Sequence, residues 1–195
     1  MVTTTTAPRE LPWTADPEAN RLLAAGANAL LIGFVLDQQV TVQKAFAGPL
    51  ALSQRLGHLD PARIAALDPE KLSAVFREKP ALHRFPGTMA ERVQALCTVL
   101  TAEYGGDGSR VWREATSGGD LAARLGALPG IGDMKVRSLI ATLVKQFGVK
   151  PQGWQKVLPD HPTLGDVDSA EALTEYQAHK RARKQAARAQ RAASS

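Results

Sequence analysis

Residues 128–135 contain the clearest pattern for chemistry in this chain of 195 residues. They read Leu-Pro-Gly-Ile-Gly-Asp-Met-Lys, in which Pro129 ends one predicted helix while Gly130 and Gly132 allow backbone conformations that other residues avoid. Because two side chains are missing there, an anion could approach the free N–H groups and positive dipole end of the next helix. The pattern indicates a phosphate-binding corner, to which Lys135 adds a mobile charge. The alternative is a tight helix-to-helix turn with no ligand.

A second cluster of polar side chains follows an almost wholly apolar stretch. Residues 28–36 predict a helix that is apolar on nearly all sides and therefore lies in the middle of the domain. Asp37, Gln38 and Gln39 come directly after it. A central helix that ends in an acid and two amides is typical of one that presents side chains to a ligand. The alternative is that these residues only cap the helix, with Asp37 facing solvent.

Helices are predicted to position both clusters. A short helical run over residues 120–125 precedes the hairpin, and the residues after it have the spacing of a helix with one buried face: Val136, Leu139, Ile140, Leu143, Val144 and Phe147. Capping acids followed by proline mark further helix starts at residues 16, 60 and 68. No alternating strand pattern is present. The sequence predicts an all-α, multi-helix fold of two lobes over residues 13–176, with a flexible leader (1–12) and a basic, poorly ordered tail (177–195).

The composition narrows the function classes. The formal net charge is +5 and the sequence pI is about 9.6, which suits a polyanionic partner. Part of this charge lies in the tail, where we expect a solvated, fraying helix that is also attracted to phosphates. Cys97 is the only cysteine, so a disulfide or a cysteine metal site within the chain is excluded, and its apolar helical surroundings predict burial. Without a signal peptide or a long apolar run, we expect a cytoplasmic monomer with no membrane partner, nucleoid-associated if prokaryotic.

Two segments resemble one known family. The sequence Leu-Pro-Gly-Ile-Gly before a long amphipathic helix resembles the helix-hairpin-helix of base-excision DNA glycosylases, the endonuclease III superfamily. Residues 35–41, Val-Leu-Asp-Gln-Gln-Val-Thr, are similar to the family's Leu-Leu-Ser-Ala-Gln-Ala-Thr, with Gln39 at the family's glutamine. The resemblance implies that Gln39 fills the gap left by an extruded base and that hairpin amides clamp duplex DNA, often with a monovalent cation on hairpin carbonyls. The DNA-binding residues that we expect are Gln38, Gln39, Leu128, Gly130, Ile131, Gly132, Asp133 and Lys135.

The chain departs from this family at its catalytic positions. Met134 stands where bifunctional members have a lysine, and Lys135 comes one residue later, which rotates it by about 100° around a helix. Gln155 stands where the family has its aspartate. A single cysteine cannot form the four-cysteine iron–sulfur cluster of many members, so no cofactor is expected beyond the hairpin cation. The remaining catalytic candidates are Asp37, as a carboxylate that could activate water, and Lys135.

These observations predict a DNA repair protein. Our leading hypothesis is a monofunctional DNA N-glycosylase that removes a damaged or mispaired base from duplex DNA, because the Schiff-base lysine is displaced. A catalytically silent lesion sensor that recruits repair partners is the alternative. A third interpretation is a protein–protein module that uses the hairpin without DNA. Phe34 and Trp154 could stack on an extruded base, although a place in the core is the alternative for both.

Overall fold

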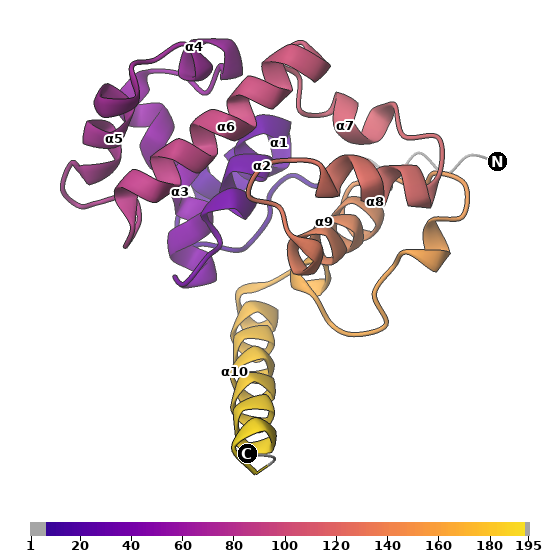
Figure 1. Ribbon diagram of the computed structural model, residues 1–195. Coiled ribbons are helices and arrows are strands. Elements are labelled where there is room, and N and C mark those ends of the chain that lie inside the picture. Colours follow the sequence, from indigo (N-terminus) through magenta and orange to yellow (C-terminus); the bar gives the residue numbers. More distant parts are fainter. Residues whose placement is uncertain (1–6, 194–195) are drawn as a thin grey trace.

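The computed structural model describes residues 7–193, and all regular structure in this range is helical. Figure 1 shows ten α-helices, with two short 3₁₀ helices in the segment that joins α9 to α10. The predicted all-α class is therefore confirmed. The elements in chain order are α1 (Pro17–Ala25), α2 (Ala27–Leu36), α3 (Val42–Leu56), α4 (Pro61–Ala65), α5 (Pro69–Arg77), α6 (Pro86–Tyr104), α7 (Arg110–Arg113), α8 (Gly118–Gly126), α9 (Asp133–Lys145), η1 (Trp154–Lys156), η2 (Leu164–Asp166) and α10 (Ala170–Ala193).

The helices form two groups that share one core. Helices α1 to α6 pack mainly on one another, while α9 packs against α8 and η2, and α8 against α7 and η1. Figure 1 shows the first group on the left and the second on the right, with α10 projecting away from both. The helix starts follow the sequence: Asp16, Asp60 and Asp68 each accept a hydrogen bond from a backbone N–H of the first turn that they cap.

Helix α2 lies at the centre because its side chains are apolar on every side. All residues from Ala29 to Leu36 are buried. Its backbone approaches α3 closely, since a Cβ atom added to Gly33 would lie 2.6 Å from the Phe46 ring. Phe34 packs edge-on against Phe46 and Trp13, with ring centroids 5.1 Å and 6.1 Å away. Phe34 is thus a core residue, which rules out its alternative role as a stacking platform.

The predicted leader and tail both overlap residues that the structure describes. Residues 1–6 and 194–195 lie outside the described range, but Leu11 within the expected leader is fully buried and its N–H donates to the Asn20 carbonyl over 3.0 Å. Its apolar side chain joins the core beside Trp13, whose indole N–H donates to Val167 O. The expected tail boundary at 177 falls inside α10, which is continuous because alanine, glutamine and basic residues are strong helix formers.

Two further observations concern Cys97 and the length of the apolar helices. Cys97 is fully buried, as predicted, and burial raises the pKa of its thiol to about 12. In the described part of the chain, no single helix combines the length and the apolar character needed to cross a bilayer. Only α1 and α2 taken together meet both criteria, and they are bent by 115° at the break between them.

Candidate functional site

The predicted hairpin connects α8 to α9 over residues 127–132. The two glycines of the hairpin differ in their surroundings. Gly130 has φ +79°, and a Cβ atom there would lie 3.2 Å from a Val35 methyl group. Gly132 has φ −86°, and a Cβ atom there would meet nothing within 4 Å. Both glycines are exposed, whereas the side chains of Leu128 and Ile131 are buried and anchor the hairpin to the core.

The hairpin leaves main-chain donors available at the start of α9. The N–H groups of Gly130, Gly132, Asp133 and Met134 have no hydrogen-bond acceptor among the described residues. The Ile131 N–H, by contrast, donates to Leu128 O over 3.1 Å. The available donors lie at the positive end of a 13-residue helix, which is a favourable place for a phosphate. Sequence reasoning missed the Met134 amide, because it treated this position only as a lost lysine.

Lys135 ties the hairpin to the end of α2. Its Nζ donates to Val35 O over 3.1 Å and to Gly130 O over 3.0 Å. Burial lowers the pKa of Lys135 to about 8, while the Asp37 carboxylate opposes this shift and Arg92 adds to it. Because its ammonium already binds two carbonyls of the chain, this geometry favours a positioning role for Lys135 over nucleophilic attack.

The hairpin carbonyls are also partly engaged. Those of Leu128, Gly130 and Gly132 each accept a hydrogen bond from within the protein. The monovalent cation on hairpin carbonyls therefore stays a prediction. Within the range that the structure describes, no group of three or more His, Cys, Asp or Glu side chains is placed to hold a metal ion.

The segment after α2 presents Gln39 to solvent. Gln39 is exposed and has φ +55°, the only positive φ of a residue other than glycine among those described. A side chain in this region of backbone space is strained and is held there by its surroundings. Asp37 is half-buried and forms the C-terminal cap of α2, where its N–H donates to Gly33 O over 3.0 Å. Its carboxylate accepts no hydrogen bond from any described residue.

His83 and Arg92 support the segment after α2 through contacts with Gln38. His83 is buried, its Nδ1 accepts from the Phe85 N–H at 3.0 Å, and its Nε2 lies 2.9 Å from Gln38 O. This pairing assigns the tautomer with a proton on Nε2, which donates to Gln38 O. Burial lowers the pKa of His83 and so favours this neutral form. Arg92 donates to the Gln38 side-chain oxygen, so the Gln38 amide supports the segment instead of facing a ligand.

Gln155 lies on η1, beside α8 and not on the segment that follows α2. Gln155 is exposed, and η1 packs against α8. In the segment before η1, Gln152 O accepts a hydrogen bond from the Gly118 N–H over 2.8 Å. Gly118 begins α8, whereas the hairpin follows the last residue of α8, about 13 Å along the helix. Trp154 shares this location and has Lys150 Nζ 5.5 Å from its ring centroid. Lys156, the residue after Gln155, lines a pocket together with Asp133, so this segment borders the start of α9 on the side of α8.

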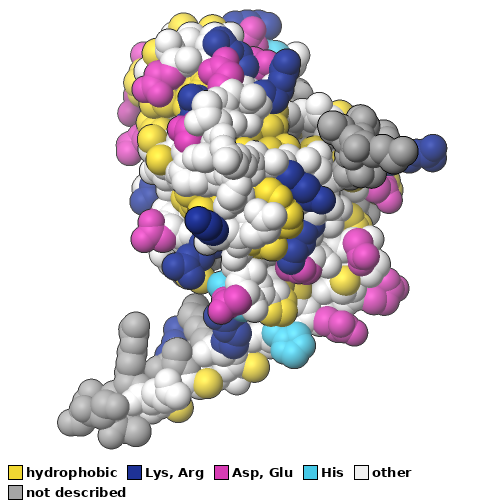
Figure 2. Space-filling view, turned by 90° about the vertical axis from the view of Figure 1, so that its right-hand side faces the viewer, with side chains coloured by type: hydrophobic (Ala, Val, Ile, Leu, Met, Phe, Trp, Pro, Cys, Tyr) yellow, Lys and Arg dark blue, Asp and Glu magenta, His cyan; other side chains and the backbone are white. Residues whose placement is uncertain are grey.

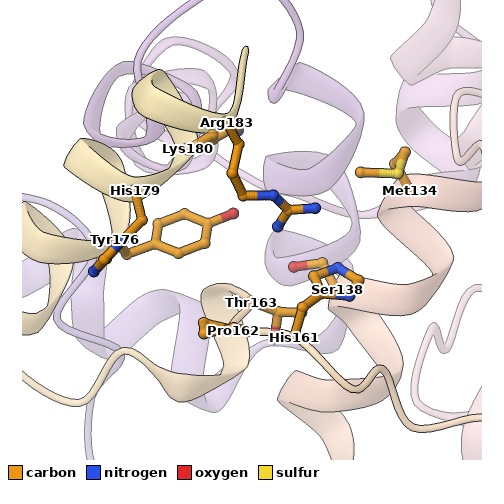
Figure 3. Close-up of a pocket in the computed structure, with 9 residues that line it drawn as sticks. All are labelled: Met134, Ser138, His161, Pro162, Thr163, Tyr176, His179, Lys180 and Arg183. Atoms are coloured by element: carbon orange, nitrogen blue, oxygen red, sulfur yellow. The ribbon is translucent and has the colours of Figure 1, made fainter. Parts of the chain in front are cut away.

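A cavity lies beside the hairpin, between α9 and α10. Its volume is about 440 Å³, and its lining includes Met134, Ser138, His161, Tyr176 and Arg183. Figure 3 shows the Tyr176 hydroxyl and the Arg183 guanidinium directed into the space between the two helices, with Ser138 and His161 below them. Sequence reasoning did not find this cavity, because α10 and α9 come together only in the folded chain.

Charge is distributed unevenly around these features. On the face that Figure 2 shows, basic and acidic side chains are interspersed and form no continuous basic surface. On α10, by contrast, Lys180, Arg181, Arg183 and Arg188 are all exposed. Positive side chains that border the hairpin therefore include Lys135, Arg137 on α9, and the α10 residues that line the cavity.

Comparison with known proteins gives one match. A family model described as "HhH-GPD superfamily base excision DNA repair protein" matches residues 32–193, which is most of the chain. Searches of curated proteins and of solved structures find no significant match.

Proposed function

The chain belongs to the HhH-GPD superfamily of base excision DNA repair proteins, and on this premise we propose that it is a monofunctional N-glycosylase acting on a damaged or mispaired base in duplex DNA. Membership of the family implies DNA binding and base excision repair. One observation supports the finer proposal: Lys135 fixes the hairpin amides against the last turn of α2. The hairpin donors are thereby held beside the last turn of α2, which directly precedes Asp37 and Gln39.

The proposed reaction requires an extruded base, because the glycosidic carbon is unreachable inside the duplex. The amides of Gly130, Gly132, Asp133 and Met134 bind phosphate oxygens of one strand, and Gln39 enters the space that the base leaves. The bond between C1′ and the base nitrogen breaks, and its electron pair leaves with the base. Asp37 stabilises the positive charge on the sugar and takes a proton from the water whose oxygen then bonds to C1′.

A monofunctional reaction is supported by the side chains next to the hairpin. A Schiff base needs a free amine near C1′. Met134 is 70% exposed and offers none, and the Lys135 amine is bonded to two carbonyls. We therefore expect base release without strand cleavage by the protein itself.

The catalytically silent lesion sensor is a second candidate. It is favoured by Gln155, because an amide stands where the resemblance places the family's aspartate. In this alternative the hairpin and Gln39 recognise distorted DNA and the chain recruits other repair proteins.

A lesion panel distinguishes the two candidates. Duplexes that contain uracil, oxidised or alkylated bases are incubated with the protein and then treated with alkali, which cleaves wherever a base has been released. The proposal predicts alkali-dependent scission with at least one lesion, and its loss in Asp37→Asn with DNA binding retained. Binding to lesions without scission for any of them would refute the enzymatic proposal and support the sensor.

A further inference from the structure

The cavity between α9 and α10 carries donors that no part of the protein uses. The Tyr176 hydroxyl, the Ser138 hydroxyl and the Arg183 guanidinium have no hydrogen-bond partner among the described residues, and all three border the cavity. Tyr176 and Ser138 are half-buried and Arg183 is exposed, so all three donors are open to a ligand that enters the cavity. These three groups therefore mark a place for a ligand rich in acceptors.

His161 adds one group of the opposite kind. Its Nδ1 lies 3.2 Å from Asp160 Oδ1, so Nδ1–H donates to that carboxylate and the neutral ring keeps an acceptor at Nε2. Several donors around a single acceptor are complementary to an imide, O=C–NH–C=O, whose N–H lies between two carbonyl oxygens. Deaminated cytosine and many oxidised pyrimidines present this edge.

The charge of the cavity lining also favours a neutral base over a cationic one. Arg183 and Lys180 are cationic, and none of the described residues that line the cavity is acidic. A base made cationic by ring alkylation would meet like charge there, which is unfavourable in a partly enclosed space. Bare phosphate is a poorer fit, because a cavity of about 440 Å³ walled by Met134, Pro162 and the Tyr176 ring offers apolar surface that suits a flat base.

The cavity also adjoins the proposed reaction site. Met134 contributes its side chain to the cavity and its N–H to the hairpin donors, so the cavity and these donors adjoin at one residue. Burial raises the pKa of Tyr176 to about 12, and the Asp37 carboxylate adds to this shift.

We propose that this cavity receives the extruded base and that its lining selects neutral imide-containing bases over cationic alkylated ones, with the C-terminal helix α10 forming the recognition wall. This inference rests on the proposed function, and it names the substrate class for it.

The test compares duplexes of one sequence that carry uracil opposite guanine, 7-methylguanine opposite cytosine, a tetrahydrofuran abasic analogue, or no lesion. The modified nucleosides have 2′-fluoro sugars, which resist base release, so that binding of the full chain is measured by fluorescence anisotropy. We expect the uracil duplex to bind about tenfold or more tightly than the 7-methylguanine duplex, the effect of two or three charge-assisted or neutral hydrogen bonds.

Variants on one helix identify the recognition wall. Arg183→Gln and Tyr176→Phe should reduce the preference for uracil to about twofold or less, because the first removes the cationic guanidinium and the second removes the hydroxyl donor. Arg181→Gln is the matched control: it removes the same charge from α10 at a residue outside this cavity and should leave the preference unchanged.

Each failure has its own signature. Equal or tighter binding of the 7-methylguanine duplex, or an unchanged preference in both variants, would overturn the inference while leaving the proposed function intact. Loss of the preference in inorganic phosphate but not in free uracil, at matched ionic strength, would identify a phosphate site and overturn it as well. An abasic duplex that binds no better than undamaged DNA would instead count against the proposed function itself.

Discussion

Lys135 shows how a single side chain can be recognised in a sequence and still be given the wrong emphasis. Its place one residue after the family's lysine was visible, but its partners were not, because Val35 lies 100 residues away in the chain. The ammonium lies at the carbonyl end of α2, where the helix dipole favours a positive charge. Its contribution is to hold the hairpin in place.

The pKa of Lys135 leads to a prediction about stability. An ordinary lysine keeps its proton up to about pH 10.5, whereas Lys135 in the folded chain releases it at about 8. Between these values the unfolded chain binds more protons, so the free energy of unfolding rises with pH through this window. Lys135→Met should therefore show a smaller rise than the wild type. Urea unfolding at several pH values tests this, and parallel profiles for the two proteins would contradict it.

His83 supports the segment that contains Gln39 through its bond to Gln38 O. His83→Ala removes a donor to Gln38 O and an acceptor for the Phe85 N–H, both in a buried position. We expect a loss of about 1–3 kcal/mol in the free energy of unfolding. Lesion binding should weaken as well. Exposed His179→Ala is the control for stability and should change the free energy of unfolding little; equal losses of stability in the two variants would argue against this supporting role.

At the scale of elements, the two hairpin glycines have different tasks. Gly130→Ala places a Cβ atom at φ +79° and 3.2 Å from Val35, so it should destabilise the fold by about 1 kcal/mol or more. Gly132→Ala adds a Cβ atom in open space and should change stability by less than about 0.5 kcal/mol. Thermal unfolding of both variants measures this difference. A Gly130→Ala protein as stable as the wild type would show that the hairpin does not need this conformation.

The elements also show what can be read from sequence. Caps at Asp16, Asp60 and Asp68, the apolar helix α2 and the hairpin are local patterns, since each depends on neighbours a few residues away. The burial of Leu11 and the cavity between α9 and α10 depend on contacts between distant segments. No spacing rule encodes such contacts, and the candidate site was therefore only half predictable.

At the scale of the whole molecule, positive charge and DNA binding are linked through salt. If the hairpin and α10 bind phosphates, the logarithm of the duplex affinity should fall linearly with the logarithm of salt concentration. Replacing Arg181 and Arg188 by glutamine should reduce the magnitude of this slope by about 1–2, because each phosphate contact contributes roughly 0.9. The same replacement of Arg9 and Arg21, before and on α1, is the control. A slope near zero in the wild type would favour the protein–protein module.

The central claim is that hairpin amides bind the DNA backbone, and Gly132→Leu tests it most directly. The extended backbone at Gly132 accepts any side chain and the space around it is open, so the fold should persist while the leucine blocks approach to the amides. Gly119→Leu, near the start of α8 at an exposed position where a Cβ atom would meet only Ser117 Oγ at 3.8 Å, is the matched control. The measurement is the affinity for undamaged duplex at fixed salt. We predict a loss of about tenfold or more for Gly132→Leu and none for Gly119→Leu; unchanged affinity in a folded Gly132→Leu protein would contradict the account.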